Sequence, residues 1–380
     1  MAKLGDIATY INGYAFKPQD WSDEGIPIIR IQDLTGNSYQ ANRYNGEYAS
    51  KYEVNDGDVL ISWSASLGVY IWHGEKAVLN QHIFKVVFDK ERISKDFFVH
   101  QVGLILENAA SDAHGATMKH LTKPIFDALP FYLPPYEKQC EIAEVLDKVT
   151  SLISLRKQQL AKLDELVKAR FVEMFGDPIN NPMKWIISKI EDITAQEKNA
   201  LKAGPFGSAL KKEFYVRSGY KIYGQEQVIC GDASFGDYYI DEEKYKELKN
   251  CAVQAGDILI SLVGTYGKTL IMPDNYEAGI INPRLMKITL NKNKVTPIYF
   301  KYYFESNALK ASMDANTHGG TMGILNLGII RQMKIQVPPL SLQNQFAAFV
   351  ERVDQQKQTV QQSLEKLELM KKALMQEYFG

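Results

Sequence analysis

The chain contains an internal repeat without gaps. Residues 115–176 align with residues 319–380 at a constant offset of 204, and 19 of the 62 aligned pairs are identical. Unrelated segments of average composition would share about 4 identities over this length. The shared landmarks are GATM at 115–118 with GGTM at 319–322, Pro134-Pro135 with Pro338-Pro339, Gln139 with Gln343, and the closing Phe175-Gly176 with Phe379-Gly380. The repeat predicts two similar structural units on one chain.

A looser repeat lies upstream of each matched segment. The corresponding pieces are Lys3–Ile7 with Lys189–Ile193, Val54–Ser62 with Val253–Ser261, and Leu79–Val86 with Ile281–Ile288. Their offsets of 186, 199 and 202 drift, which indicates insertions. Each half of the chain is therefore a divergent region followed by a well-matched one.

The well-matched regions have the apolar spacing of long helices. Apolar residues recur at steps of 3 and 4 over about five heptads, which is typical of a coiled-coil seam. The seam residues are Ile142, Leu146, Val149, Ile153, Leu160, Leu163, Val167 and Met174 in the first copy, and Phe346, Val350, Val353, Val360, Leu364, Leu367, Leu374 and Tyr378 in the second. Arg156, Arg170, Lys357 and Lys371 fill the remaining seam positions. Each helix of about 37 residues would be about 55 Å long.

An amphipathic helix of this length needs a partner for its apolar stripe. One interpretation packs each helix on its own globular domain. The other packs the two helices on each other, which their equal length favours. The spacing alone leaves open whether such a pair would be parallel or antiparallel.

The upstream regions are predicted to be mixed α/β. Segments 25–34 and 219–228 have the composition of strands that follow a turn. Gly57-Asp58 and Gly256-Asp257 are predicted turns before the apolar strands VLIS and ILIS. Helices are expected at 93–108 and 295–313. The predicted domain boundaries are 1–135 and 177–338 for the two α/β domains, and 136–176 and 339–380 for the two helices.

Composition excludes several classes of protein. No window contains about 18 uninterrupted apolar residues, so we expect no transmembrane helix, and the N-terminus lacks a signal-peptide core. Three widely spaced cysteines argue against a disulfide framework and for a cytoplasmic location, and the six histidines form no metal-site spacing. The formal net charge is −1, whereas proteins that bind DNA mainly through phosphates are usually basic.

Two segments resemble catalytic motifs, but each lacks a residue that its motif requires. Leu133–Tyr136 (LPPY) resembles the NPPY box of adenine methyltransferases, but Leu133 cannot form the hydrogen bonds of the required Asn. Leu262–Thr269 (LVGTYGKT) resembles a P-loop with Leu in place of its first Gly, and a turn between strands is the better interpretation. No nucleophile–base signature is present in a supporting context. The sequence therefore favours a binding protein.

The ordered set of features, repeated twice, resembles the specificity subunit of a type I restriction–modification system. The features are the GxTMxxL…PP…Q junction, the heptad helix ending in Phe-Gly, and the GDxLIS strand. This resemblance implies an α+β fold with two similar target-recognition domains joined by two long helices in an antiparallel coiled coil. It also implies that each domain reads one half of a bipartite, asymmetric DNA site, while the helices set the spacer.

The resemblance further implies partners and cofactors. Two modification subunits would dock on the chain and methylate adenine N6 with S-adenosylmethionine, and two restriction subunits would use ATP and Mg²⁺. The chain itself would be non-catalytic and hold no cofactor or metal. Helix faces away from the seam are the expected partner contacts, with Glu141, Lys148, Lys162, Lys168, Arg352, Lys366 and Lys372 as candidates.

Base-reading side chains are expected in loops of the divergent regions, where polar residues can reach base edges. The candidates are Lys17, Arg30, Gln32, Asp33, Ser64, Ser66, Gln81 and His82 in the first domain, and Lys211, Lys212, Tyr223, Gln225, Glu226, Thr265, Lys268, Asn282 and Arg284 in the second. For each of them, an ordinary solvated side chain is the alternative.

Two other classes of function stay open from the sequence. The chain could be an enzyme with an unrecognised site, such as part of a fused methyltransferase–nuclease, or a coiled-coil adaptor without a nucleic-acid role. Methyl transfer by the isolated chain would favour the enzyme. Failure to bind DNA even with methyltransferase subunits present would favour the adaptor.

Overall fold

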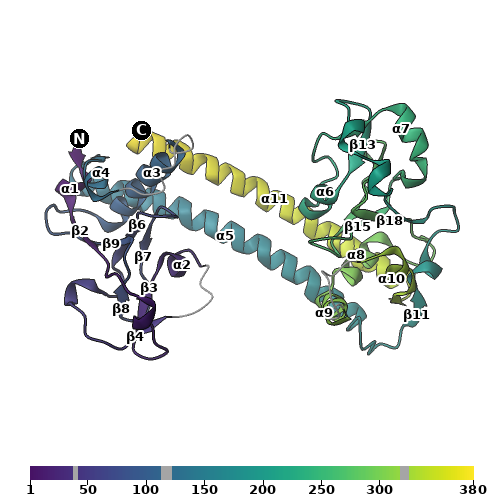
Figure 1. Ribbon diagram of the computed structural model, residues 1–380, viewed down its shortest axis with the longest axis horizontal. Coiled ribbons are helices and arrows are strands. Elements are labelled where there is room, and N and C mark those ends of the chain that lie inside the picture. Colours follow the sequence, from purple (N-terminus) through teal and green to yellow (C-terminus); the bar gives the residue numbers. More distant parts are fainter. Residues whose placement is uncertain (37–41, 113–121, 317–324) are drawn as a thin grey trace. The chain divides into compact units, whose positions relative to one another are not determined.

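The computed structural model describes residues 1–36, 42–112, 122–316 and 325–380 (Figure 1). The repeated GATM and GGTM motifs at 115–118 and 319–322 lie outside the described residues. The chain divides into two compact units. Unit 1 comprises Met1–Gln158 with Gln361–Gly380, and unit 2 comprises Gln159–Val360. Each unit contains one α/β region and a part of both long helices.

The core of unit 1 is a four-stranded antiparallel sheet. Its strand order is β2 (Thr9–Asn12), β9 (Ile83–Val87), β6 (Val59–Ser62) and β7 (Gly68–Ile71). Helix α3 (Lys95–Asp112) packs its Phe97, Phe98 and Val102 with Val59 and Ile61 of this sheet. The short helices α1 (Leu4–Ile7) and α4 (Lys123–Asp127) and the strand pair β1 (Ala2–Lys3) and β10 (Pro130–Phe131) complete this layer.

A second sheet covers the other side of the first. Its order is β4 (Arg43–Tyr44), β3 (Ile26–Ile29), β8 (Ala77–Leu79) and β5 (Glu53–Val54), and β3 and β8 run parallel. Ile29 and Leu79 from this sheet pack with Leu60 and Ile83 from the first. Helix α2 (Ile31–Leu34) follows β3 directly, and 3₁₀ turns occupy Pro18–Asp20 and Ser50–Tyr52.

Unit 2 repeats this topology. Its antiparallel sheet has the order β12 (Leu201–Ala203), β18 (Leu285–Ile288), β15 (Ile258–Ser261) and β16 (Thr269–Ile271). The second sheet has the order β14 (Tyr239–Ile240), β13 (Tyr220–Tyr223) and β17 (Gly279–Ile281), with β13 and β17 parallel. The pair β11 (Ile186–Lys189) and β19 (Lys334–Val337) corresponds to β1 and β10.

The helices of unit 2 surround these sheets. They are α6 (Gln225–Cys230), α7 (Glu242–Glu247), α8 (Pro297–Phe304), α9 (Asn307–Asn316) and α10 (Leu327–Gln332), with 3₁₀ turns at Ile190–Ile193, Gly207–Ala209, Lys212–Phe214 and Lys249–Cys251. Tyr299 and Phe300 of α8 enter the core, as Phe97 and Phe98 of α3 do in unit 1.

Three expected elements differ in detail from the prediction. Segments 25–34 and 219–228 begin as strands but continue as helices α2 and α6, because the side chains of Asp33 and Gln227 accept hydrogen bonds from the backbone N–H of Arg30 and Gly224. The predicted helix at 295–313 is divided into α8 and α9. The hydroxyl of Ser306 accepts a hydrogen bond from the N–H of Leu309 and so begins a new helix.

The long helices are α5 (Tyr136–Phe175) and α11 (Leu340–Phe379), each of 40 residues (Figure 1). Within unit 1, Nε of Arg156 donates to the hydroxyl of Ser363, and Lys157 pairs with Glu368 at 2.9 Å. Within unit 2, Lys357 pairs with Asp164 at 2.6 Å and Phe346 lies against Phe171. In unit 2, the contact on α11 falls from Lys357 to Phe346 as the contact on α5 rises from Asp164 to Phe171, so the helices run antiparallel.

The predicted seam residues lie on the buried or half-buried side of the two helices. Buried seam residues are Ile142, Leu146, Val149 and Val167 on α5, and Phe346, Val350, Val353, Val360 and Leu364 on α11. Ile153, Leu160, Leu163, Met174, Leu367, Leu374 and Tyr378 are half-buried. The helix ends also join the cores of the α/β regions, since Ile142 packs with Phe97 and Val350 packs with Val295. The apolar stripe of each helix therefore serves both predicted purposes: it faces the other long helix along part of its length and the α/β region at its end.

Candidate nucleic-acid interface

In each unit, two parallel strands end side by side and are followed by polar residues. Ile29 of β3 is paired with Leu79 of β8, and Tyr223 of β13 is paired with Ile281 of β17. The chain continues into α2 and Asn80–His82 in unit 1, and into α6 and Asn282–Arg284 in unit 2. Because the carboxyl ends of parallel strands meet at one edge of a sheet, these segments converge.

A loop from the antiparallel sheet joins the same edge. After β6, the N–H of Trp63 donates to the carbonyl oxygen of His82 at 3.2 Å. After β15, the N–H of Leu262 donates to the carbonyl oxygen of Arg284 at 2.9 Å. We call these surfaces the polar edges: residues 30–33, 63–67 and 80–82 in unit 1, and residues 224–226, 262–268 and 282–284 in unit 2.

The repeated GDxLIS motif holds the middle loop of each polar edge. The fully buried hydroxyls of Ser62 and Ser261 donate to the carbonyl oxygens of Ser66 and Thr265. At the other end of the motif, Asp58 pairs with Lys85 at 2.8 Å, and Asp257 pairs with Lys287 at 3.1 Å. The matched sequence therefore forms the frame, while the divergent residues occupy the loops.

A glycine brings one further segment against each polar edge. A Cβ at Gly13 would lie 2.0 Å from the carbonyl oxygen of Asn80, and a Cβ at Gly204 would lie 1.8 Å from that of Asn282. Both distances are shorter than any real contact, so only glycine allows this approach. The segments 13–16 and 204–207 therefore begin in contact with the polar edges of unit 1 and unit 2.

Most of the candidate base readers of unit 1 lie at its polar edge. Ser66 is exposed, and Gln32, Gln81 and His82 are half-buried. The His82 ring lies 5.0 Å from the ring of Trp63.

Arg30 and Asp33 contact each other at this edge. Arg30 Nε lies 3.7 Å from the Asp33 carboxylate, and its guanidinium lies over the ring of Trp21. Lys17 is exposed at the start of the 3₁₀ turn Pro18–Asp20.

The candidates of unit 2 gather in the same way. Glu226, Thr265, Lys268 and Arg284 are exposed, while Gln225 and Asn282 are half-buried. The Gln225 amide donates to the carbonyl oxygen of Val263, and the Asn282 side chain accepts from the N–H of Arg284 at 2.9 Å. These two bonds fix the edge loops and leave the Arg284 side chain in solvent. Lys211 and Lys212 are exposed at the 3₁₀ turn Lys212–Phe214.

Two candidates are corrected by their burial. Tyr223 is 0% exposed, and its hydroxyl donates to the carbonyl oxygen of Glu277 at 2.6 Å. Burial is the main cause that raises the pKa of this hydroxyl. Ser64 is buried as well. Neither side chain is accessible to DNA in this conformation, because both are buried.

The sequence interpretation missed Phe206, which is 89% exposed. It lies two residues after Gly204, in the segment that starts on the polar edge of unit 2. The signal was its position between Pro205 and Gly207, a turn composition in which a large apolar residue has no core to enter.

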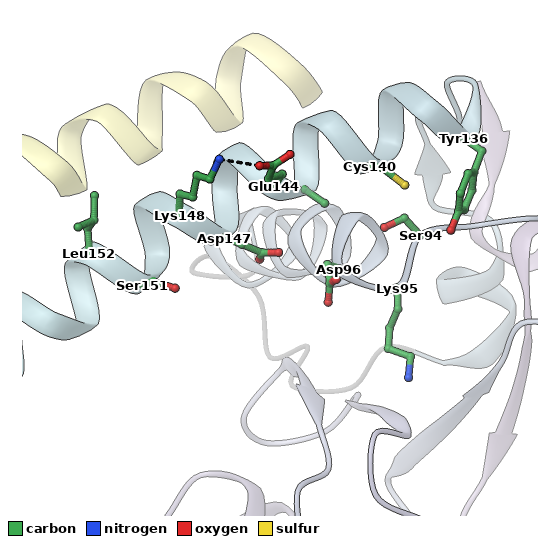
Figure 2. A pocket seen from close by; sticks show the side chains of 11 residues that line it. Ser94, Lys95, Asp96, Tyr136, Cys140, Glu144, Asp147, Lys148, Ser151 and Leu152 are labelled. Atoms are coloured by element: carbon green, nitrogen blue, oxygen red, sulfur yellow. Dashed lines mark hydrogen bonds and ion pairs between the residues drawn. The ribbon is translucent and has the colours of Figure 1, made fainter.

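A separate groove lies on unit 1, between the start of α3 and helix α5 (Figure 2). It is lined by Ser94, Lys95 and Asp96 at the start of α3 and by Tyr136, Cys140, Ala143, Glu144, Asp147, Lys148, Ser151 and Leu152 of α5. Lys148 pairs with Glu144 at 2.6 Å across one helical turn, as Figure 2 shows. His100 of α3 meets Asp147 at 2.7 Å and ties the two helices together.

The sequences that only imitate catalytic motifs have structural roles. Leu262–Thr269 connects the antiparallel strands β15 and β16, whereas a P-loop leads from a strand into a helix. The carbonyl oxygen of Pro134 accepts a hydrogen bond from the Gln139 amide at the start of α5. Among the described residues, no cluster of three or more His, Cys, Asp or Glu is arranged to hold a metal ion, and no helix has the length and apolar character to cross a bilayer.

Comparison with known proteins decides the family. The family model described as the type I restriction modification DNA specificity domain matches residues 1–165 and again residues 182–369. The chain belongs to this family. Two copies of one domain match, as the duplicated topology requires.

Relatives of this specificity family match along nearly the whole chain. The EcoBI type I restriction enzyme specificity subunit of Escherichia coli is 22% identical over 92% of this chain and 78% of its own length. The MjaVIII specificity subunit of Methanocaldococcus jannaschii is 22% identical over 99% of this chain and 90% of its own. The family is the specificity subunit of type I systems, so the chain is a non-catalytic, DNA-recognition subunit.

Solved structures support the fold. A chain from a study of complex assembly and conformational transition of the type I R-M system superposes with a TM-score of 0.61 at 15% identity, and covers 100% of this chain and 96% of that one. The type I S subunit from M. genitalium gives 0.52 at 14% identity, with coverage of 100% and 95%. The fold of specificity subunits is thus retained although few of the residues are identical.

Proposed function

We propose that each polar edge reads one half of a bipartite DNA site. The observation that carries this proposal is the duplication of one edge geometry with different side chains: Asn80–His82 beside residues 63–67 in unit 1, and Asn282–Arg284 beside residues 262–268 in unit 2. Reading a base pair requires side chains on its edge, and each mismatched pair costs about 1–3 kcal/mol. Two edges therefore add their discrimination.

The test exchanges one side chain at each edge. In a complex with its methyltransferase subunits, His82→Ala and Arg284→Ala should each relax selectivity at positions in one half-site, and in different half-sites. The measurement is the rate of adenine methylation on duplexes in which each base pair is changed in turn. If both variants relaxed the same half-site, or all positions equally, the assignment of one edge to each half-site would be wrong.

The net charge of −1 leaves this chain without an excess of cationic side chains to bind phosphates. Phosphate contacts give affinity without sequence information, and affinity falls with salt in proportion to the number of such contacts. We infer that the methyltransferase partners provide most of the phosphate contacts. The isolated chain is then expected to bind DNA weakly, with a shallow dependence of log Kd on log salt, and the complex with a steep one. A steep slope for the isolated chain would contradict this.

The same proposal assigns the groove of Figure 2 to a methyltransferase subunit. Its lining combines the exposed Leu152 with charges of both signs, Asp96, Glu144 and Lys148, which suits a polar protein interface better than a nucleic-acid backbone. We further propose two modification and two restriction subunits, with S-adenosylmethionine, ATP and Mg²⁺ bound by those partners.

The three cysteines provide a probe of this docking. Cys140 lies in the groove and is exposed, Cys230 is exposed on α6, and Cys251 is buried. Burial raises the pKa of the Cys251 thiol, and the thiolate is the reactive form. Alkylation of the isolated chain should therefore modify Cys140 and Cys230. Binding of methyltransferase subunits should protect Cys140 and leave Cys230 reactive, whereas equal rates at Cys140 with and without them would remove the groove from the interface.

A further inference from the structure

Phe206 is an apolar side chain held in solvent by a fixed backbone. Its ring is 89% exposed, and no aromatic or cationic partner for it is found among residues 1–36, 42–112, 122–316 and 325–380. Its carbonyl oxygen accepts a hydrogen bond from the N–H of Ala209 at 2.8 Å, which begins the 3₁₀ turn Gly207–Ala209. Covering an exposed phenyl ring lowers the free energy, because apolar surface is removed from water. The exposure of Phe206 therefore indicates a binding partner.

The position of the loop identifies that partner. The N–H of Gly204 donates to the carbonyl oxygen of Leu285 at 2.9 Å, and Gly204 lies directly against Asn282. Phe206 is two residues further on, within about 7 Å along the chain. The loop that carries Phe206 therefore starts on the surface of Asn282 and the exposed Arg284. An apolar ring has no favourable contact with phosphate, but it can pack on a thymine methyl group or on the face of a base.

We propose that Phe206 contacts a DNA base directly and adds apolar readout to the half-site read by unit 2. This inference rests on the DNA-reading function proposed above. Unit 1 provides a contrast at the corresponding loop. There Ala15 stands two residues after Gly13, as Phe206 stands two residues after Gly204, and the next residue, Phe16, is buried against the rings of Tyr14 and Tyr44. Phe206 therefore has no aromatic counterpart at the matching position of unit 1.

The experiment compares Phe206→Ala with the parent chain, both assembled with the methyltransferase subunits. Methylation rates are measured on duplexes in which each base pair of the site is changed in turn. Phe206→Ala should reduce discrimination about tenfold at one or two adjacent base pairs, and Phe206→Leu should retain part of it. Those pairs should lie in the half-site that Arg284→Ala affects. Ile186→Ala is the matched control, because Ile186 is 75% exposed on β11 and is expected to leave every position unchanged.

Two results would overturn the inference. An unchanged discrimination profile would mean that the ring touches no base. A uniform fall in rate at every position would mean that it contacts a partner subunit or the DNA backbone. Thermal unfolding of the variant should match that of the parent, since an exposed ring contributes little to the core. If the parent complex itself showed no sequence preference, the proposed DNA-reading function would fail, and this outcome is distinct from a change that follows Phe206 alone.

Discussion

The repeated glutamine shows how a single side chain explains a sequence identity. The side-chain oxygens of Gln139 and Gln343 accept hydrogen bonds from the N–H of Ser94 and Thr296, at the starts of α3 and α8. Their amide nitrogens donate to the carbonyl oxygens of Pro134 and Pro338. Both glutamines are buried. Each one joins the long helix to the helix of its own α/β region, so the same residue recurs at the constant offset.

Removing this amide should destabilise the chain. Gln343→Ala leaves the N–H of Thr296 and the carbonyl oxygens of Pro338 and Lys294 without their partner, and each unsatisfied buried group costs about 1–3 kcal/mol. We expect the free energy of unfolding to fall by about 3 kcal/mol, measured in urea. Gln345→Ala, exposed on the same helix, is the control and should stay within about 0.5 kcal/mol of the parent. Equal midpoints for the two variants would contradict this role.

At the scale of elements, periodicity predicted the long helices and their seam but not their direction. A heptad pattern is the same for parallel and antiparallel pairs, and the direction depends on specific contacts such as Lys357 with Asp164. The short helices α2 and α6 escaped prediction for a different reason. They are started by single side chains, Asp33 and Gln227, that carry no periodic signal.

Two leucines of α11 separate the seam from the exposed face. Leu364 is 6% exposed and Leu369 is 69% exposed. Leu364→Ala should lower the free energy of unfolding by about 2–4 kcal/mol, because it removes buried methyl groups and leaves a cavity. Leu369→Ala should change it by less than about 0.5 kcal/mol. Thermal melts followed by circular dichroism at 222 nm compare the two, and a larger loss for Leu369→Ala would place the seam on the wrong face.

At the scale of the whole molecule, the duplication predicted where the candidate site would lie better than which residues form it. Matching positions after matching strands, such as His82 and Arg284, do converge on corresponding edges. The sequence could not resolve the burial of Tyr223, which ends a strand with consecutive buried residues, or of Ser64, which lies two residues beyond β6. Phe206 was overlooked because polar residues were sought, although an apolar residue in a turn is the stronger sign of a partner.

The proposed bipartite recognition gives the length of the paired helices a measurable consequence. Insertion of seven residues after Gln158 in α5 and seven after Val360 in α11 adds one heptad to each helix and so preserves the seam. Seven residues add about 10 Å of helix, which is about three base pairs of duplex. The methylated sites are therefore expected to keep both half-sites and to gain a spacer about three base pairs longer, as sequencing of methylated adenines would show.

The control is the same insertion in α5 alone. It leaves seven residues without a counterpart on α11, so the seam on one side of the insertion loses its register and methylation at any bipartite site should fall steeply. If the paired insertion left the spacer unchanged, the length of the helices would not determine the spacer of the DNA site. The spacer would then have to be set by the methyltransferase subunits, and the two polar edges would be readers whose separation on DNA is imposed by their partners.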